Sequence, residues 1–404
     1  MPFIIISIVK AALVAFVLLT TLAYLQWIER KVLAHIQLRV GPYRVGPHGL
    51  LQPLADVIKL ITKEGVLPPH VNKFFYLFAP FLAVALALVS ISVIPFGTKL
   101  EIPALGFSTP MELTDVNIGI LVILAISAVG VYGVALGGWA SNNKYSLLGG
   151  LRSAAQMISY ELPMSLAIVS PLLLANTLSM RELVDAQAGF YFGFIPKWHV
   201  FQLFPLQGAA FLIFIIAAFA ETNRVPFDLP EAENELVAGF HTEYSSMAFA
   251  GFFMAEYCNM VTISAVATHL FLGGWHPPFP APYSDYLAPL LFFLSAGALF
   301  FHSLQTLKTR TWDKYTFPAF GVIFGGIGLL LLGAIVLAPW LREAIMPLFW
   351  FAAKAGAILF VFIWIRGTLP RFRYDQLMKF TWLFLFPVAL VQLMLTGLMV
   401  ALGN

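Results

Sequence analysis

Long apolar stretches separated by short polar ones dominate the hydropathy pattern of the chain. A transmembrane helix needs about 20 mainly apolar residues, and about ten stretches reach or approach that length. Helices are the expected form because lipid offers the backbone no hydrogen-bond partners. The pattern therefore predicts an all-α, polytopic transmembrane bundle in one integral membrane domain, residues 1–404. The expected spans lie near residues 3–27, 74–96, 116–137, 154–175, 205–221, 247–272, 286–305, 316–338, 345–366 and 379–402.

One further apolar segment, LLQPLADVIKLITKEG (50–65), has a different pattern. Leu50, Leu54, Ile58 and Ile61 recur at helical spacing, and a polar stripe with Asp56 lies opposite. This pattern predicts an amphipathic helix near 50–63 in the plane of the membrane interface. A short helix buried in the bundle is the alternative.

Composition agrees with a membrane protein and narrows the chemistry. Of 404 residues, 60% are hydrophobic and 11% charged, with a mean hydropathy of +0.86, whereas soluble domains carry about 25% charged residues. Neither a separate soluble domain nor a nucleic-acid partner is expected. The one cysteine, Cys258, cannot form a disulfide within the chain or supply the roughly four thiolates of an iron–sulfur cluster. We expect a small buried side chain there and no metal site.

The basic residues indicate an orientation. If the N-terminus is outside and the loops alternate, most of the 23 Lys and Arg residues fall in inner loops. This bias is the positive-inside pattern, which predicts cytoplasmic basic loops in a bacterial inner membrane. Lys10 and Lys354 fall inside spans. The outer loops hold Lys99, Arg181, Lys197 and Arg342.

An acidic stretch, FAETNRVPFDLPEAENELVAG (219–239), lies on this basic side with Arg224 as its one cation. Glu231 and Glu235 are four residues apart and would repel each other on one helical face. Asp228 could cap that helix, with Glu231 at its third position. A solvated acidic face is the alternative, but interleaved apolar residues argue against it. The candidate titrating set is Glu221, Asp228, Glu231, Glu233, Glu235 and Glu243.

Two more acids lie at membrane depth: Glu161 in the fourth span and Glu256 in the sixth. A charged side chain at a helix centre costs about 2.5–3.5 kcal/mol on insertion scales. Such residues usually face a bundle interior or a wet cavity, so a proton or ion path is the leading hypothesis. A carboxyl kept neutral or paired for packing is the alternative.

Four blocks of the sequence resemble one family. They are ERKVLAHIQLRVGPYRVGPHGLLQPLADVIKLITKE (29–64), GWASNNKYSLLGGLRSAAQMISYELP (138–163), FAETNRVPFDLPEAENELVAGFHTEYSSMAFAGFFMAEY (219–257) and WIRGTLPRFRYDQLMKFTWLFLFP (364–387). In this order they are similar to the H subunit of respiratory complex I, the proton-translocating NADH:quinone oxidoreductase. The mitochondrial counterpart of that protein is NADH dehydrogenase subunit 1.

The resemblance implies a membrane-arm subunit that helps form the quinone cavity and couples quinone reduction to proton translocation. Such a subunit has no catalytic redox centre and binds no cofactor. Iron–sulfur clusters and FMN belong to partner subunits, and quinone is the substrate. The implied partners are the peripheral-arm subunits of the quinone site and the small and antiporter-like membrane subunits, within the lipid bilayer.

The family's functional positions carry over through these blocks. Quinone-binding positions match Arg30, Arg39, Asp56 and Arg366. Proton-path positions match Glu161, Glu221, Asp228, Glu231, Glu233, Glu235, Glu243 and Glu256.

One feature departs from the family, which usually has eight spans: residues near 286–340 add two more. An even number of extra spans leaves the last two helices correctly oriented. The alternative functions are an anchor subunit of a related ion-pumping dehydrogenase or membrane-bound hydrogenase, a freestanding proton-coupled transporter, and a purely structural anchor.

Overall fold

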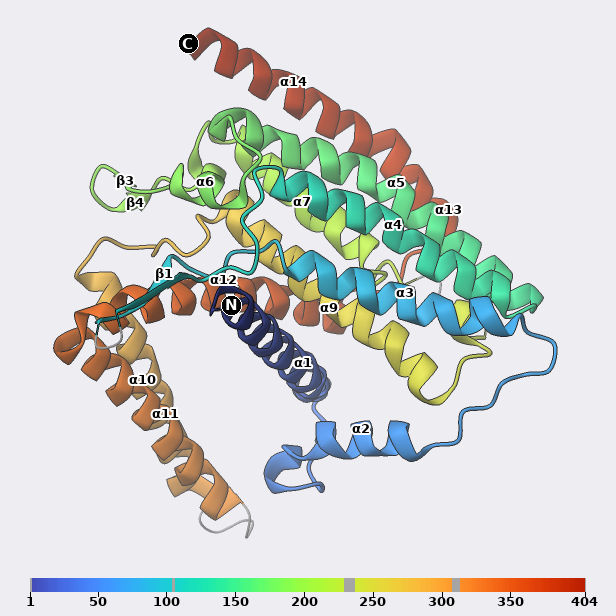
Figure 1. The fold of residues 1–404 in the computed structure, drawn as a ribbon, viewed down its shortest axis with the longest axis horizontal. Helices are drawn as coiled ribbons and strands as arrows, with labels where there is room; N and C mark the ends of the chain where they lie inside the picture. The colour runs from blue at the N-terminus through green and yellow to red at the C-terminus, as the bar shows by residue number, and fades with distance from the viewer. Residues whose placement is uncertain (1, 104–105, 229–236, 307–312, 404) are drawn as a thin grey trace.

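The computed structural model describes residues 2–103, 106–228, 237–306 and 313–403, and almost all of its regular structure is helical (Figure 1). Helices run alongside one another through most of the molecule, as the hydropathy pattern predicts. The long helices are α1 (Pro2–Ile36), α3 (Lys73–Ile91), α4 (Gly119–Ala140), α5 (Lys144–Ala175), α7 (Leu206–Glu221), α9 (Ser246–Phe271), α10 (Tyr283–Thr306), α11 (Asp313–Leu337), α12 (Pro339–Thr368) and α14 (Phe386–Gly403).

Shorter elements connect them. The helical ones are α2 (Gln52–Thr62), α6 (Met180–Asp185), α13 (Tyr374–Phe380), 3-10 turns at Pro47–Gly49, His199–Phe201 and Gly239–His241, and a π-helical turn at Thr381–Leu385 that joins α13 to α14. Two small antiparallel hairpins pair β1 (Lys99–Ile102) with β2 (Phe107–Pro110) and β3 (Phe190–Tyr191) with β4 (Ile195–Pro196).

The predicted spans are confirmed as helices. Among the described residues, nine helices are long and apolar enough to cross a membrane, so the chain is a multi-pass membrane protein. The tenth expected span, α7, has 16 residues. At 1.5 Å per residue it rises about 24 Å, less than the roughly 30 Å of a bilayer's hydrocarbon core.

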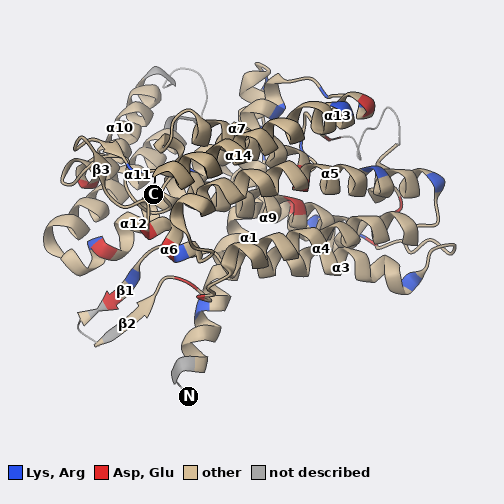
Figure 2. Cartoon of the chain, turned by 90° about the horizontal axis from the view of Figure 1, so that it is seen from above, with Lys and Arg blue, Asp and Glu red and all other residues tan. Residues whose placement is uncertain are grey.

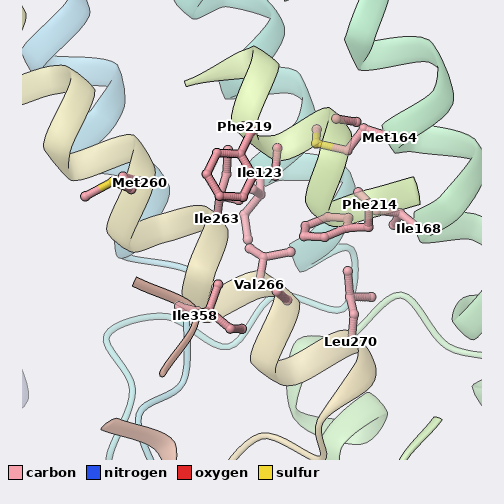
Figure 3. Packing of buried hydrophobic residues seen from close by; sticks show 14 of the residues in the cluster. Ile123, Met164, Ile168, Phe214, Phe219, Met260, Ile263, Val266, Leu270 and Ile358 are labelled. Atoms are coloured by element: carbon pink, nitrogen blue, oxygen red, sulfur yellow. The ribbon is translucent and has the colours of Figure 1, made fainter. Parts of the chain in front are cut away.

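Helix α7 forms the centre of the largest core. Ala210, Ala217 and Ala218 are fully buried, and the Phe219 ring stacks on Phe362 of α12 at a centroid distance of 3.9 Å. Figure 3 shows Phe214 of α7 among side chains from the helices around it. Because its last residues, 217–221, are all buried, α7 can end within the bundle without exposing its last carbonyls to lipid.

The chain after α7 is irregular and still buried. Thr222, Arg224 and Asp228 are each less than 10% exposed. Non-helical backbone at membrane depth is tolerated where protein or a wet cavity surrounds it. The short α7 therefore places the start of the acidic stretch inside the bundle.

The predicted amphipathic helix forms as α2, on the surface. Its apolar residues Leu54, Ile58 and Ile61 are 57%, 52% and 61% exposed. This exposure is typical of an interfacial helix and rules out the alternative of a short helix buried in the bundle.

The extra pair, α10 and α11, forms a helical hairpin at one side of the molecule (Figure 1). A small core of Ala288, Leu331 and Met346 joins it to α12. At the start of α12, Arg342 Nη2 lies 2.5 Å from Asp285 Oδ2 at the start of α10.

Figure 2 shows where charge is tolerated. Lys, Arg, Asp and Glu gather at helix ends and in loops, and most helices are uncharged over their length. The charged residues that are buried inside the bundle therefore need a specific explanation.

Helices α4 and α5 cross closely at Gly138 and Gly150. A Cβ on Gly138 would lie 2.6 Å from the Ser146 carbonyl oxygen, which is backbone and cannot move aside easily. Gly138→Ala should lower the apparent melting temperature of the purified protein by several degrees, because overpacking costs about 1–3 kcal/mol. Gly130→Ala on the same helix is the matched control, since a Cβ there meets nothing within 4 Å. Equal melting temperatures for the two variants would contradict this packing.

Candidate functional site

A buried carboxylate, Glu29 on α1, is the centre of a charged cluster between α1, α9, α12 and the segment after α7. Its side chain is 3% exposed. Its Oε1 pairs closely with Arg366 Nη1 of α12 and accepts from Arg224 Nη1 at 3.3 Å. Its Oε2 accepts a hydrogen bond from the Tyr257 hydroxyl of α9 at 2.8 Å. One carboxylate thus joins three other segments.

Arg224 connects Glu29 to a second acid. Its Nε lies 2.7 Å from Oε1 of Glu256, one residue before Tyr257 on α9. Its guanidinium also lies 4.1 Å from the centroid of the Tyr257 ring, in cation–π geometry. Arg224 is therefore shared between two carboxylates on different helices.

The cluster is balanced in charge. The carboxylates Glu29 and Glu256 oppose the guanidiniums Arg224 and Arg366, and arginine stays protonated in proteins. Isolated charges in a low-dielectric interior are very costly, whereas paired and hydrogen-bonded ones are tolerated. Arg366 keeps a side-chain exposure of 36%, so the cluster reaches a surface there.

A cavity of about 100 Å³ lies beside the cluster, with Glu256 in its wall. Its polar lining includes Ser127 of α4, Glu221 of α7, His241, and Asn259 of α9. The Ser127 hydroxyl donates a short hydrogen bond to Glu221 Oε1. A cavity of this size with several polar groups has room for water molecules that could bridge them.

Glu161 extends this set toward α5. It is partly buried, and its charge acts on Glu221. Of the acids that the sequence placed at membrane depth, Glu256 thus shares the cavity with Glu221, and Glu161 lies on the neighbouring helix α5.

Three other predicted acids, outside this cavity, each have a partner. Asp56 on α2 accepts from Arg30 Nη1 at 2.9 Å and from Gln52 Nε2 at 2.9 Å. Asp228 pairs with Arg371 Nη2 at 3.1 Å. Glu243 accepts from Asn143 Nδ2 at 2.7 Å.

The remaining predicted residues are placed differently. Arg39 lies on an exposed loop, where its Nε donates to the side chain of Gln37 at 2.8 Å. Glu231, Glu233 and Glu235 lie outside the described residues, as does the body of the helix that Asp228 was expected to cap.

Sequence reasoning missed Glu29, the central residue. A signal was available, because Leu18, Leu22, Leu25 and Glu29 follow one another at helical spacing and all are buried. Because Glu29 continues that apolar stripe, its carboxylate lies on the face of α1 that packs against the bundle. The next residue, Arg30, is exposed. The partners of Glu29 carried no such signal, because they come from segments far away in sequence.

Lys354 of α12, which the sequence placed inside a span without a role, is also buried. Its Nζ donates to the carbonyls of Leu272 at 2.6 Å and His276 at 2.8 Å, just beyond α9. It also lies 4.6 Å from the centroid of the Trp198 ring. A cation at a helix C-terminus satisfies carbonyls that lack partners within the helix. We interpret Lys354 as a structural cap.

The described residues contain no group of three or more His, Cys, Asp or Glu placed to hold a metal ion. Cys258 is a buried free thiol, as expected, and its Sγ donates to the Ala87 carbonyl.

Glu29→Gln should lower the apparent melting temperature sharply. Breaking a buried ion pair costs about 3–5 kcal/mol, because the partner charge stays buried. Adding Arg366→Gln should cost less than the sum of the two single changes, with a coupling of about 1–3 kcal/mol. Thermal unfolding of the two single variants and the double variant measures this coupling. Strictly additive losses would mean that the two side chains do not interact.

His241, in the loop between α7 and α9, makes stability depend on pH. Burial lowers its pKa to about 3, against about 6.5 for an unfolded chain. Between these values the unfolded chain binds a proton that the folded protein does not. Stability should therefore fall as pH drops below about 6.5, by about 1.4 kcal/mol per pH unit for this residue.

The melting temperature of His241→Gln, measured from pH 7 to pH 5, should fall less steeply than that of the unchanged protein. The control is His35→Gln, which changes an exposed histidine. Parallel slopes for the unchanged protein and His241→Gln would show that folding does not change the pKa of His241.

Comparison with known proteins identifies the family. The sequence pattern of the family described as NADH dehydrogenase matches residues 9–397. The chain is 66% identical to the first of two H subunits of NADH-quinone oxidoreductase from Solibacter usitatus, over 99% of this chain and 98% of that protein. It is 48% identical to the second H subunit of the same enzyme from Koribacter versatilis, over 99% and 98%. It is 43% identical to the first H subunit from Geobacter sulfurreducens, over 99% and 96%.

These matches cover nearly the whole chain, including the added hairpin. The chain therefore belongs to the NADH dehydrogenase family, in the group of H subunits of NADH-quinone oxidoreductase, which is respiratory complex I.

Proposed function

We propose that this chain forms part of the quinone cavity of an NADH:quinone oxidoreductase and couples quinone reduction to proton translocation. The observation that carries the proposal is the unbroken series of charged groups from Arg366 through Glu29 and Arg224 to Glu256. This series leads from a partly exposed guanidinium to a cavity whose wall also holds Glu221. Intramembrane acids facing such a cavity are typical of proton paths.

The quinone end of the path lies at the inner ends of α1 and α12. Arg30, Asp56 and Arg366 surround this end, and Arg39 lies on the loop between α1 and α2. Arginine suits this position because it stays charged and donates several hydrogen bonds to oxygen atoms. The quinone is a substrate, and electrons reach it from an iron–sulfur cluster in a partner subunit that receives them through FMN.

The coupling step uses the shared arginine. Reduction of the quinone consumes protons and changes the charge beside Arg366. A shift of Arg366 toward the quinone weakens its pairing with Glu29, which then holds Arg224 more strongly. Arg224 in turn releases Glu256, whose proton affinity rises. Glu256 and Glu221 line one cavity, and neighbouring acids titrate as a coupled set, so the change reaches Glu221 and, through it, Glu161.

The acids outside the cavity supply this set with protons. Asp228 and Glu243 are paired in the described structure, and Glu231, Glu233 and Glu235 complete the acidic stretch in the sequence. The basic loops lie on the cytoplasmic side of a bacterial inner membrane, with the N-terminus outside. The antiporter-like membrane subunits receive the signal, and the peripheral-arm subunits cover the quinone.

The alternative functions predict different behaviour. A freestanding proton-coupled transporter would move a solute when reconstituted alone. A structural anchor would not be labelled by photoreactive quinone analogues within 29–64 or 219–257. An anchor of a related hydrogenase or dehydrogenase would copurify with a different set of redox subunits. The family membership and the charged series beside the cavity favour the quinone-linked complex.

Glu221→Gln in the assembled complex tests the coupling. The amide keeps the shape and the contact with Ser127 but cannot release a proton. NADH-driven proton uptake by inverted membrane vesicles should fall at least several-fold. Glu64→Gln, which changes an exposed acid beyond α2, should leave it unchanged. Full proton uptake in the Glu221→Gln complex would show that Glu221 is not part of the proton path.

A further inference from the structure

The added hairpin contacts the loop between α1 and α2 through His48. The Nε2 of His48 lies 2.6 Å from the Thr316 hydroxyl on α11, across a sequence separation of 268 residues. The His48 ring also lies 5.0 Å from the Phe317 ring and 6.4 Å from the Phe320 ring, both on α11. This contact is specific because it combines a hydrogen bond with aromatic packing.

The backbone of this loop is unusual at His48. The φ of His48 is +52°, which is uncommon for a residue with a side chain, and Gly46 and Gly49 nearby also have positive φ. A Cβ on Gly49 would lie 2.5 Å from the Pro42 carbonyl oxygen, so the turn is closed too tightly for any other residue. Such a conformation persists only when its surroundings hold it. The contacts with α11 help to do so.

The same loop is bound to α1 on its other side. The Arg39 amide donates to the Ala34 carbonyl at 2.8 Å. The Tyr43 ring lies 5.3 Å from the His48 ring and 5.6 Å from Lys31 Nζ, a cation–π distance. Lys31 follows Arg30, which pairs with Asp56 of α2. A continuous set of contacts thus runs from Thr316 to the inner end of α1.

The hairpin itself is anchored on α12, the helix that carries Arg366. The Phe292 ring lies 6.1 Å from the Phe349 ring, and Asp285 pairs with Arg342. The hairpin therefore contacts α12 at one end and His48 at the other. Figure 1 shows the hairpin at one side of the main bundle.

We propose that His48 is a positioning residue, through which the α10–α11 hairpin fixes the 39–51 loop, and with it Arg30 and Arg39, for quinone binding. This inference rests on the proposed function. It gives the two added helices a role in the affinity for quinone, since a loop that is already ordered loses less entropy when substrate binds.

The test measures NADH:quinone reductase kinetics in the assembled complex with Thr316→Val and His48→Phe, singly and together. Each change removes the hydrogen bond and keeps a side chain of similar shape. The KM for quinone should rise about two- to five-fold with kcat nearly unchanged. The double variant should be no worse than the worse single one, because both lose the same contact. His48→Gln, which can keep a polar atom near the Nε2 position, should restore most of the affinity.

Ser295→Ala is the matched control on the same hairpin, because that hydroxyl bonds to Leu291 of its own helix. It should leave KM unchanged. A fall in melting temperature for Thr316→Val without a change in KM would overturn the proposal and leave only a packing role. The proposal would also be overturned if the increases in KM of Thr316→Val and His48→Phe multiply in the double variant, because the two side chains would then act independently.

Arg366→Gln separates this inference from the proposed function. A raised KM for Arg366→Gln with normal KM for Thr316→Val contradicts only the positioning role. Normal quinone kinetics for both variants contradicts the quinone site itself.

Discussion

The burial of Glu29 between two arginines and a tyrosine is the interaction on which the rest of the site depends. A carboxylate inside a bundle is stable only with opposite charge and hydrogen-bond donors around it. Arg224, Arg366 and Tyr257 supply these from separate parts of the chain. The same pairing brings α1, α9, α12 and the segment after α7 to one point, so the electrostatic requirement also fixes the packing of the helices.

The shortness of α7 allows Arg224 and Glu256 to join this cluster. Because α7 ends at Glu221, the chain turns within the bundle and carries Arg224 to a depth where Glu29 and Glu256 can share it. The early end of α7 thus places the start of the acidic stretch, from Glu221 to Asp228, where the surrounding protein accepts irregular backbone.

The sequence was sufficient for the architecture and for the types of residue at the site, but not for their pairing. The apolar stretches marked every long helix, although α5 begins at Lys144, ten residues before the expected span, because its first turns are polar.

Glu161 and Glu256 were found because a charge at membrane depth is costly. Glu29 was missed because it lies at the end of an apolar run beside two cations, which is also the pattern of a simple membrane anchor. Nothing local assigns Arg224 to Glu29 and Glu256, since these partners lie on α1 and α9. For Arg39 only the resemblance assigns a place at the quinone site, and the structure adds that it lies on an exposed loop beside Gln37.

Redox-induced infrared difference spectroscopy of the assembled complex tests the central claim most directly. The claim is that reduction of the quinone changes the protonation of buried carboxyls in this chain. Reduction with NADH should produce a difference band in the carboxylic acid C=O stretching region that diminishes in Glu256→Gln. A spectrum that is identical in the unchanged complex and in Glu256→Gln, with quinone reduction intact in both, would contradict the account.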